Sequence, residues 1–118
     1  CASTFAYQVV GRGRRELAET FWATQRLFPL PDLSIYLVVS PEIGLARTSC
    51  CGGVPTRFDS ESLEFHKRVG AGYDEYFAHI DGHTRVLRID AEKQEEDVQD
   101  VAFTAVGPLI GASLSVCK

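Results

Sequence analysis

Apolar residues recur every three or four positions along much of the chain, and serine, proline and glycine residues separate these stretches. This spacing places apolar side chains on one face of a helix and polar side chains on the other. Together with capping residues, the pattern predicts five helices, at residues 3–10, 14–27, 41–47, 60–79 and 98–109. The face expected to be buried in the fourth helix consists of Leu63, Phe65, Val69, Tyr73, Tyr76, Phe77 and Ile80.

Several predicted helix features depend on single residues. Ser3 or Thr4 would cap the first helix, because serine and threonine oxygens accept hydrogen bonds from a first turn. Ser40 is expected to cap the third helix, where Pro41 suits the first helical position. The acidic run 92–97 is expected to be the solvated start of the last helix. The second helix is expected to pack through Leu17, Phe21, Thr24 or Gln25, and Phe28.

Two short runs rich in apolar residues, Leu33–Val39 and Thr84–Ile89, predict strands. The first shows little alternation, which is typical of a strand covered on both faces in a parallel sheet. Long helical crossovers also favour a parallel sheet with helices on both faces, so the predicted fold class is α/β. Because two strands are few for such a sheet, we expect residues 1–118 to be one part of a larger single domain.

Composition and charge narrow the class of protein. A formal net charge of -4 and a pI near 5.3 argue against a general nucleic-acid binder. No run approaches the ~18 apolar residues of a membrane span, and no signal-peptide pattern is present. We therefore expect a cytoplasmic protein that binds neither nucleic acid nor membrane.

The first residue and the cysteines bear on processing and redox state. The chain starts at Cys1 and contains no methionine, which indicates a processed product or an internal fragment; the small sheet favours the fragment. Cys50, Cys51 and Cys117 are the other cysteines, and none has C-x-x-C or ligand spacing with the histidines. We therefore expect free thiols and no metal site.

The segment 48–60 carries the first candidate chemistry. It is rich in glycine and cysteine, it follows Arg47 and it contains Arg57. Phosphoryl transfer depends on neutralising charge on the moving group, and an arginine on a closing loop supplies that charge. A lid over a nucleotide is one interpretation, and a solvated surface loop is the other. No G-x-x-x-x-G-K-[ST] phosphate loop occurs in the sequence.

Three polar side chains of the first predicted helix form a second candidate site. Thr4 and Gln8 are four residues apart and so share one face of an α-helix, with Tyr7 beside them. A hydroxyl, a phenol and an amide on one surface can read the edge of a base and pack on a sugar. An exposed polar helix face without a ligand is the alternative.

Four segments together resemble the C-terminal half of bacterial thymidylate (dTMP) kinases. They are STFAYQ with the following GRG, PDLSIYLVVSPEIGLAR, TRFDSESLEFHKRV and RVLRIDA. Their order and spacing match over nearly the whole chain, and the combination is specific although each segment alone is weak. The resemblance implies a P-loop kinase fold, with a parallel sheet between layers of helices. It also implies phosphorylation of dTMP to dTDP by ATP, with Mg²⁺ carried by the nucleotide.

The same resemblance implies roles for the candidate residues on the dTMP side. Thr4 falls at the family position that faces the thymine, and Gln8 falls at a second base-contacting position. Tyr7 falls beside the deoxyribose, where a phenol disfavours a 2′-hydroxyl.

On the ATP side, the resemblance implies that Arg47 packs on the adenine. Arg57 matches a lid arginine that acts on the phosphates, which makes it the candidate catalytic residue. Asp90 and Ala91 match the turn after the last strand, next to the adenine.

The sequence departs from the family pattern in two ways. The family's phosphate loop and Asp-Arg motif would precede Cys1, so we expect the isolated chain to be inactive. Ser49 and Cys51 stand where many family lids carry arginines. Two alternatives therefore stay open: a non-catalytic kinase-like domain that binds a nucleotide or a partner, and another P-loop nucleoside-phosphate kinase.

A homodimer is a further implication, because the family commonly dimerises through helices. The apolar faces around Phe21–Trp22 and Leu63–Phe65 are candidate interfaces. The same residues also suit a hydrophobic core, which is the interpretation that the sequence favours.

Overall fold

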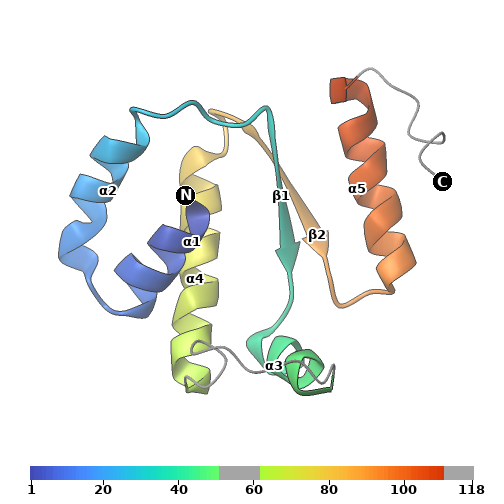
Figure 1. Cartoon of the computed structure of the whole chain (residues 1–118), viewed down its shortest axis with the longest axis horizontal. Coiled ribbons are helices and arrows are strands. Elements are labelled where there is room, and N and C mark those ends of the chain that lie inside the picture. The colour runs from blue at the N-terminus through green and yellow to red at the C-terminus, as the bar shows by residue number, and fades with distance from the viewer. Residues whose placement is uncertain (51–61, 111–118) are drawn as a thin grey trace.

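The computed structural model describes residues 1–50 and 62–110. In that part the chain forms a mixed α/β structure of helices around a two-stranded sheet (Figure 1). The elements in chain order are α1 (Ala2–Thr4), the π-helix η1 (Phe5–Gly11), the 3-10 helix η2 (Arg15–Leu17), α2 (Ala18–Gln25), β1 (Leu33–Val38), α3 (Pro41–Cys50), α4 (Leu63–Ile80), β2 (Arg85–Asp90) and α5 (Glu95–Ile110).

The two strands pair in parallel, which confirms the predicted sheet. Their register runs from Leu33 opposite Arg85 to Val38 opposite Asp90. Both strands therefore end at the same level, and the segments that follow them leave from one edge of the sheet (Figure 1).

Helices α4 and α5 lie on opposite sides of this sheet (Figure 1). The ring of Tyr36 in β1 stacks on that of Phe77 in α4, with centroids 4.6 Å apart. Tyr36 pairs with Arg88, and the preceding Leu87 points to the other face because side chains alternate along a strand. On that face Leu87 lines a hollow together with residues of α5.

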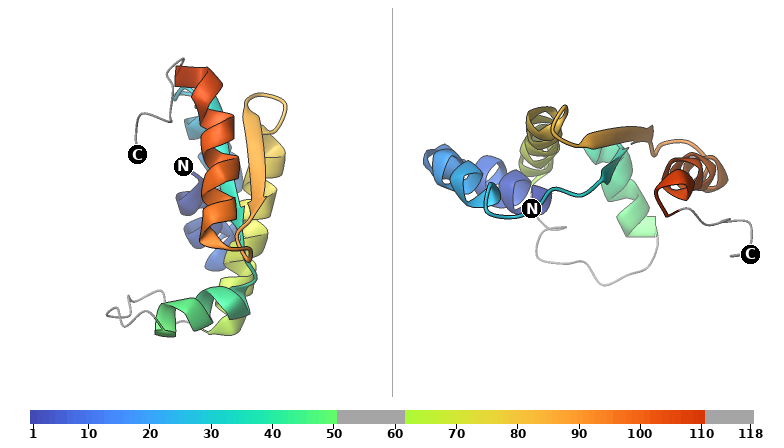
Figure 2. Two further views of the ribbon diagram at one scale, coloured as in Figure 1. Left: turned by 90° about the vertical axis from the view of Figure 1, so that its right-hand side faces the viewer. Right: turned by 90° about the horizontal axis from the view of Figure 1, so that it is seen from above.

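The covering of β1 is less complete than predicted. Leu37 is 51% exposed and Val38 is 37% exposed, so the expectation of a strand covered on both faces is wrong at its C-terminal end. Helix α3 lies beyond the ends of the strands and runs across their direction (Figure 2). A hollow of about 420 Å³ therefore adjoins Leu37, between α3 and α4, where a fully covered strand would meet side chains.

The core lies mainly between η1 and α4. Its most buried members, each at most 5% exposed, are Phe5, Ala6, Val9, Phe65, Val69, Tyr76 and Ile80. Gly72 allows the two backbones to approach, since a Cβ at this position would lie 2.8 Å from the Cα of Ala6. That distance is shorter than real Cβ contacts, so only glycine fits without a shift of one helix.

Most of the buried face predicted for α4 is confirmed. Phe65, at 2% exposed, belongs to the core, as the sequence favours, whereas Leu63 at the first helical position is 38% exposed. The oxygen of Ser62 accepts a hydrogen bond from the backbone N–H of Phe65 at 3.2 Å. The helix therefore begins after this cap, later than predicted, and ends at Ile80.

The N-terminal helix differs from the prediction in its start and its hydrogen bonding. It begins at Ala2, so Ser3 and Thr4 lie inside it and neither is a side-chain cap. The Ser3 hydroxyl instead shares a 2.8 Å hydrogen bond with the hydroxyl of Tyr73. From Phe5 onward the helix is of the π type, in which bonds run from residue i to i+5.

Helix α2 is shorter than predicted, and its predicted packing face is confirmed at Phe21 but wrong at Leu17 and Phe28. Leu17 is 38% exposed, and Phe28 is 62% exposed because the helix ends at Gln25. The contacts with the core come from Phe21 and Trp22, whose rings each lie 5.1 Å from that of Phe5. These two aromatic residues are half-buried and pack against the core, which agrees with the interpretation that the sequence favours.

Helix α3 confirms its predicted cap and extends further than predicted. The oxygen of Ser40 accepts a hydrogen bond from the N–H of Ile43 at 3.4 Å. The helix continues to Cys50, so the first residues of the predicted lid at 48–60 are helical. The remainder of that segment, including Arg57, lies outside the described residues. Helix α5 begins at Glu95, and its first turn contains Glu95, Glu96 and Asp97, where acidic side chains suit the helix dipole. The prediction that the acidic run 92–97 starts the last helix is therefore confirmed for these three residues, whereas Glu92 lies before the helix.

Candidate functional site

The segments that follow the two strands meet at one edge of the sheet. β1 leads through Val39 and Ser40 into α3, and β2 leads into a turn at residues 91–94. The backbone N–H of Ala91 donates to the carbonyl of Val38 at 2.8 Å, which continues the strand pairing beyond Asp90. The start of α3 is thereby held beside the turn.

Arg47, in the last turn of α3, reaches the same turn. Its Nη1 donates to the carbonyl oxygen of Ala91 at 2.7 Å, and its Nη2 donates to that of Glu92 at 3.4 Å. Arg47, Asp90 and Ala91 are candidate residues from distant segments of the sequence, and the structure brings all three to one place. We call the group of Ser40, Arg47, Ala91 and Glu92 the strand-end junction.

Glu92 is the member of the strand-end junction that the sequence analysis missed. Its Oε1 accepts a hydrogen bond from the backbone N–H of Ser40 at 3.0 Å, across 52 positions of sequence. Its own N–H donates to Oδ1 of Asp90 at 3.0 Å, a local turn bond that aspartate often forms. An aspartate at a strand end signals that turn, but no sequence pattern pairs Glu92 with Ser40.

A cavity of about 500 Å³ opens beside the strand-end junction. Arginine stacks on planar rings through its guanidinium group, and apolar walls favour the same kind of ligand. Leu37 and Val98 are apolar members of a lining that is otherwise mostly polar and charged, so the cavity offers a surface for a flat ring beside the guanidinium of Arg47. Its lining residues are Leu37, Arg47, Ala91, Glu92, Lys93, Gln94, Glu95 and Val98.

The three candidate residues of the N-terminal helix lie at a different place. Thr4 and Gln8 are exposed, whereas Tyr7 is half-buried and lies with its ring 6.0 Å from Phe65 and 6.3 Å from Tyr73. Because η1 is a π-helix, the α-helical spacing assumed for positions 4 and 8 does not apply strictly. The hydroxyl and the amide still face solvent, and the phenol ring faces the core.

A second cavity lies between these two places. It has a volume of about 420 Å³ and is bounded by β1, α3 and α4. Tyr73, which contacts Tyr7, lines it on one side, and Leu37 lines both this cavity and the one at the strand-end junction. His66 also lines it, and its Nε2 is buried without a hydrogen-bond partner among the described residues.

Two tyrosines, the half-buried Tyr36 in β1 and the buried Tyr76 in α4, have raised pKa values. Burial raises the pKa of Tyr36, and the hydrogen bond that its hydroxyl donates to Asp74 at 2.8 Å raises the pKa further. Burial also raises the pKa of Tyr76. Both side chains stay neutral at ordinary pH, so they contribute packing and hydrogen bonding rather than charge.

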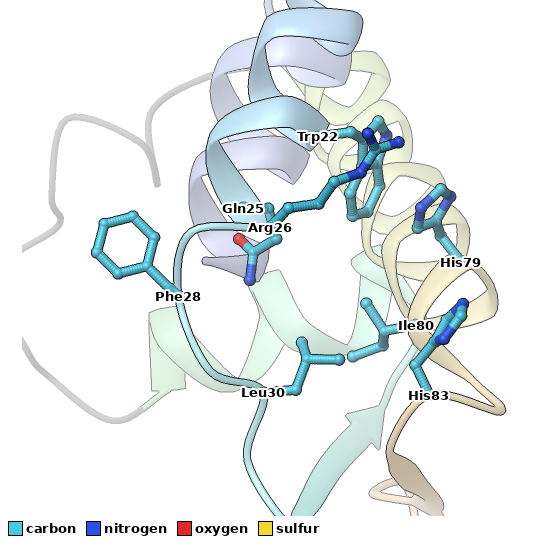
Figure 3. A pocket seen from close by; sticks show the side chains of 8 residues that line it. All are labelled: Trp22, Gln25, Arg26, Phe28, Leu30, His79, Ile80 and His83. Carbon is cyan, nitrogen blue, oxygen red and sulfur yellow. The ribbon is translucent and has the colours of Figure 1, made fainter.

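A third cavity, between α2 and the end of α4, contains none of the candidate catalytic or nucleotide-binding residues. Figure 3 shows it, with the side chains of Trp22, His79 and His83 on one side and Phe28 pointing away. The rings of Trp22 and His79 are stacked with centroids 3.7 Å apart. This stack joins α2 to α4 at the side of the molecule away from the strand-end junction.

The described residues form neither a metal-binding cluster nor a membrane-spanning helix. Residues 1–50 and 62–110 contain no group of three or more histidine, cysteine, aspartate or glutamate side chains placed to hold a metal ion. No helix in the same part is long and apolar enough to cross a membrane. Cys1 is a free and exposed thiol; the side chains of the other cysteines lie outside the described part.

Comparison with known proteins gives consistent matches. The family model described as thymidylate kinase matches residues 1–102. The thymidylate kinase of Thermomicrobium roseum is 40% identical over 109 residues, which cover 88% of this chain and 49% of the relative. That of Solidesulfovibrio magneticus is 37% identical over 115 residues, covering 92% and 54%. The chain spans about half the length of the curated relatives that it matches.

Proposed function

The chain belongs to the thymidylate kinase family, and from this premise we propose that the protein containing it phosphorylates dTMP with ATP. In this reaction an oxygen of the dTMP phosphate forms a bond to the γ-phosphorus of ATP. The bond from that phosphorus to the bridging oxygen breaks, which leaves ADP and dTDP. Mg²⁺ carried by the nucleotide would neutralise charge on the phosphates.

One observation carries the proposal: Arg47 and Ala91 meet beside a cavity of about 500 Å³. These are two of the residues that the family resemblance places around the adenine. We infer that the adenine of ATP enters this cavity, against the guanidinium of Arg47 and beside the turn formed by Asp90 and Ala91. The apolar side chains of Leu37 and Val98 on its walls support a ring as the ligand.

The dTMP side of the proposal rests on the N-terminal helix. Thr4 and Gln8 are exposed, so their polar groups are available to the edge of a thymine. Tyr7 is held by rings of α4, which would keep a phenol in a fixed position beside the deoxyribose. The cavity that Tyr73 and Leu37 line lies between this helix and the proposed adenine site.

The remaining parts of the proposal come from family membership. They are a P-loop kinase fold, action of Arg57 on the phosphates from a lid at about 48–60, a cytoplasmic location and a homodimer. Arg57 would lower the barrier by placing positive charge on the moving phosphoryl group.

The test is an assay of dTDP formation by the complete protein, with dTMP and dCMP compared as acceptors. Thymine presents a carbonyl oxygen where cytosine presents an amino group, so a base-reading amide distinguishes them. Gln8→Ala is expected to reduce the preference for dTMP roughly tenfold, a loss within the range for a hydrogen-bonded base contact. Gln99→Ala, on the exposed side of α5, is the matched control and should keep the wild-type preference for dTMP. An unchanged preference in Gln8→Ala would contradict the role of Gln8.

The same assay separates the kinase from a non-catalytic nucleotide-binding domain. Ser49 and Cys51, at positions where family lids carry arginines, are the observation that keeps this second function open. Saturable binding of ATP and dTMP by the complete protein without formation of dTDP would establish it.

A further inference from the structure

We propose that Glu92 is a positioning residue that sets the affinity for ATP by fixing helix α3 against the turn after β2. The inference rests on the proposed function, because it assumes that the adenine enters the cavity at the strand-end junction. Glu92 also lines this cavity, but its carboxylate is bonded to the backbone of Ser40. Its part is to hold the elements that carry Arg47 and Ala91.

The contacts show a helix tied to the turn at both ends. At its start, the N–H of Ser40 donates to the carboxylate of Glu92 at 3.0 Å. In its last turn, Arg47 donates to the carbonyls of Ala91 and Glu92. A helix held at one point can pivot about it, whereas two separated points fix its direction. If the bond to Glu92 were lost, the bonds of Arg47 would be the remaining side-chain hydrogen bonds between α3 and this turn among the described residues.

Ser40 joins this attachment to the helix itself. Its side-chain oxygen caps α3 through the N–H of Ile43, while its backbone N–H is held by Glu92. The carboxylate thus binds the residue that defines the first turn. A negative charge near a helix start is also favourable, because the backbone dipoles leave positive charge there.

Glu92 is itself placed by the end of β2. Its N–H donates to Oδ1 of Asp90, the last residue of the strand. Asp90, Glu92 and Ser40 therefore form a chain of hydrogen bonds from the end of one strand to the helix that follows the other. This gives Asp90 a part in the site that needs no contact with ATP.

The proposal predicts an effect on ATP binding with a distinct kinetic pattern. Glu92→Ala in the complete protein should raise both the Kd and the KM for ATP about five- to tenfold, within the range expected when one exposed hydrogen bond of ordinary strength is lost. The KM for dTMP and kcat should stay within about twofold, because Glu92 lies at the proposed adenine cavity and away from the residues proposed for dTMP. Glu92→Gln keeps an oxygen acceptor and should restore most of the affinity. Glu96→Ala, an acidic side chain of α5 outside the junction, should behave as wild type.

Amide hydrogen exchange of the complete protein without nucleotide provides a separate measurement. The Ser40 amide should exchange faster in Glu92→Ala than in the wild type, and at the wild-type rate in Glu92→Gln and Glu96→Ala. Unchanged Ser40 exchange in Glu92→Ala, or equal ATP affinity in that variant and the wild type, would overturn the role of Glu92 alone. A rise in the KM values of both substrates would overturn it as well. Failure of the wild type to bind ATP would overturn the proposed function, and the exchange result would still report whether the bond exists.

Discussion

Arg47 donates a hydrogen bond to the carbonyl oxygen of Ala91 at 2.7 Å, although the two residues lie 44 positions apart in the sequence. The bond joins the helix after one strand to the turn after the other. It also fixes the guanidinium group beside a cavity whose other walls are largely supplied by the turn and the start of α5.

Replacement of Arg47 should weaken ATP binding without affecting dTMP. Arg47→Ala removes both a stacking surface and the bonds to the turn, so we expect the KM for ATP to rise at least ~10-fold, about 1.4 kcal/mol. Arg47→Lys should recover little, because an ammonium lacks the planar fork. Steady-state kinetics with each substrate varied in turn would measure this. Arg26→Ala, at an exposed arginine after α2, is the control; equal effects of the two alanine variants would refute the assignment.

Two glycines of α4 provide a matched test of the contact with η1. A Cβ at Gly72 would lie 2.8 Å from the Cα of Ala6, whereas a Cβ at Gly70 would meet nothing within 4 Å. Gly72→Ala should lower the free energy of unfolding by about 1–3 kcal/mol, as overpacking does. Gly70→Ala should raise it by about 0.5–1 kcal/mol, because alanine is the better helix former. Urea unfolding of both variants checks the pair, and a stable Gly72→Ala would contradict the close approach.

Two phenylalanines, one buried and one exposed, provide a matched test of where the core lies. Phe5 is fully buried against Phe21, Trp22 and Tyr76, and Phe28 is 62% exposed. Phe5→Ala should cost about 3–5 kcal/mol of unfolding free energy, whereas Phe28→Ala should change it by less than about 0.5 kcal/mol. Trp22 is the only tryptophan of these 118 residues and lies against Phe5, so its fluorescence reports unfolding of this core. Similar losses in both variants would show that the core is placed wrongly.

Stability should fall at alkaline pH partly through Tyr36. Its pKa in the folded state is raised by burial and by the bond to Asp74, so the folded protein holds the phenolic proton more tightly than the unfolded chain. This contribution is complete below about pH 10, the pKa of an unfolded tyrosine, and is lost as the pH rises through the folded-state pKa. We therefore compare the urea concentration at the midpoint of unfolding at about pH 8 and about pH 11. Its decrease between these two pH values should be smaller in Tyr36→Phe than in the wild type. Tyr76 also contributes to the alkaline loss, so the slope should shrink rather than vanish. Equal losses would contradict the role of Tyr36.

The elements were predictable because each one depends on local signals. Ser40, Pro41 and Ser62 stand at or beside helix starts in the sequence and in the structure. The bounds of the N-terminal helix were missed, because the Ser3 hydroxyl bonds to Tyr73, 70 positions away, rather than to its own turn. Local helix preferences do not reveal a hydrogen-bond partner that is so distant in the sequence.

The candidate site also contains both residues that the sequence indicates and one that it does not. Arg47 and Ala91 were identified through the family resemblance, and the structure adds that they bond to each other. Glu92 was missed because it opens an acidic run that looks like a solvated helix start. Its partner is a backbone N–H, which every residue except proline has, so no side-chain pattern could have marked Ser40 as that partner.

The two strands end opposite each other, and this limits which insertions and deletions the protein tolerates. Val38 lies opposite Asp90, and both segments of the strand-end junction start from this pair. One residue inserted into either strand would move its end by about 3.3 Å and reverse which face each later side chain occupies. Insertions in the loop between α2 and β1 would leave this pair in place. Among natural variants we therefore expect insertions and deletions to spare both strands and to collect outside them.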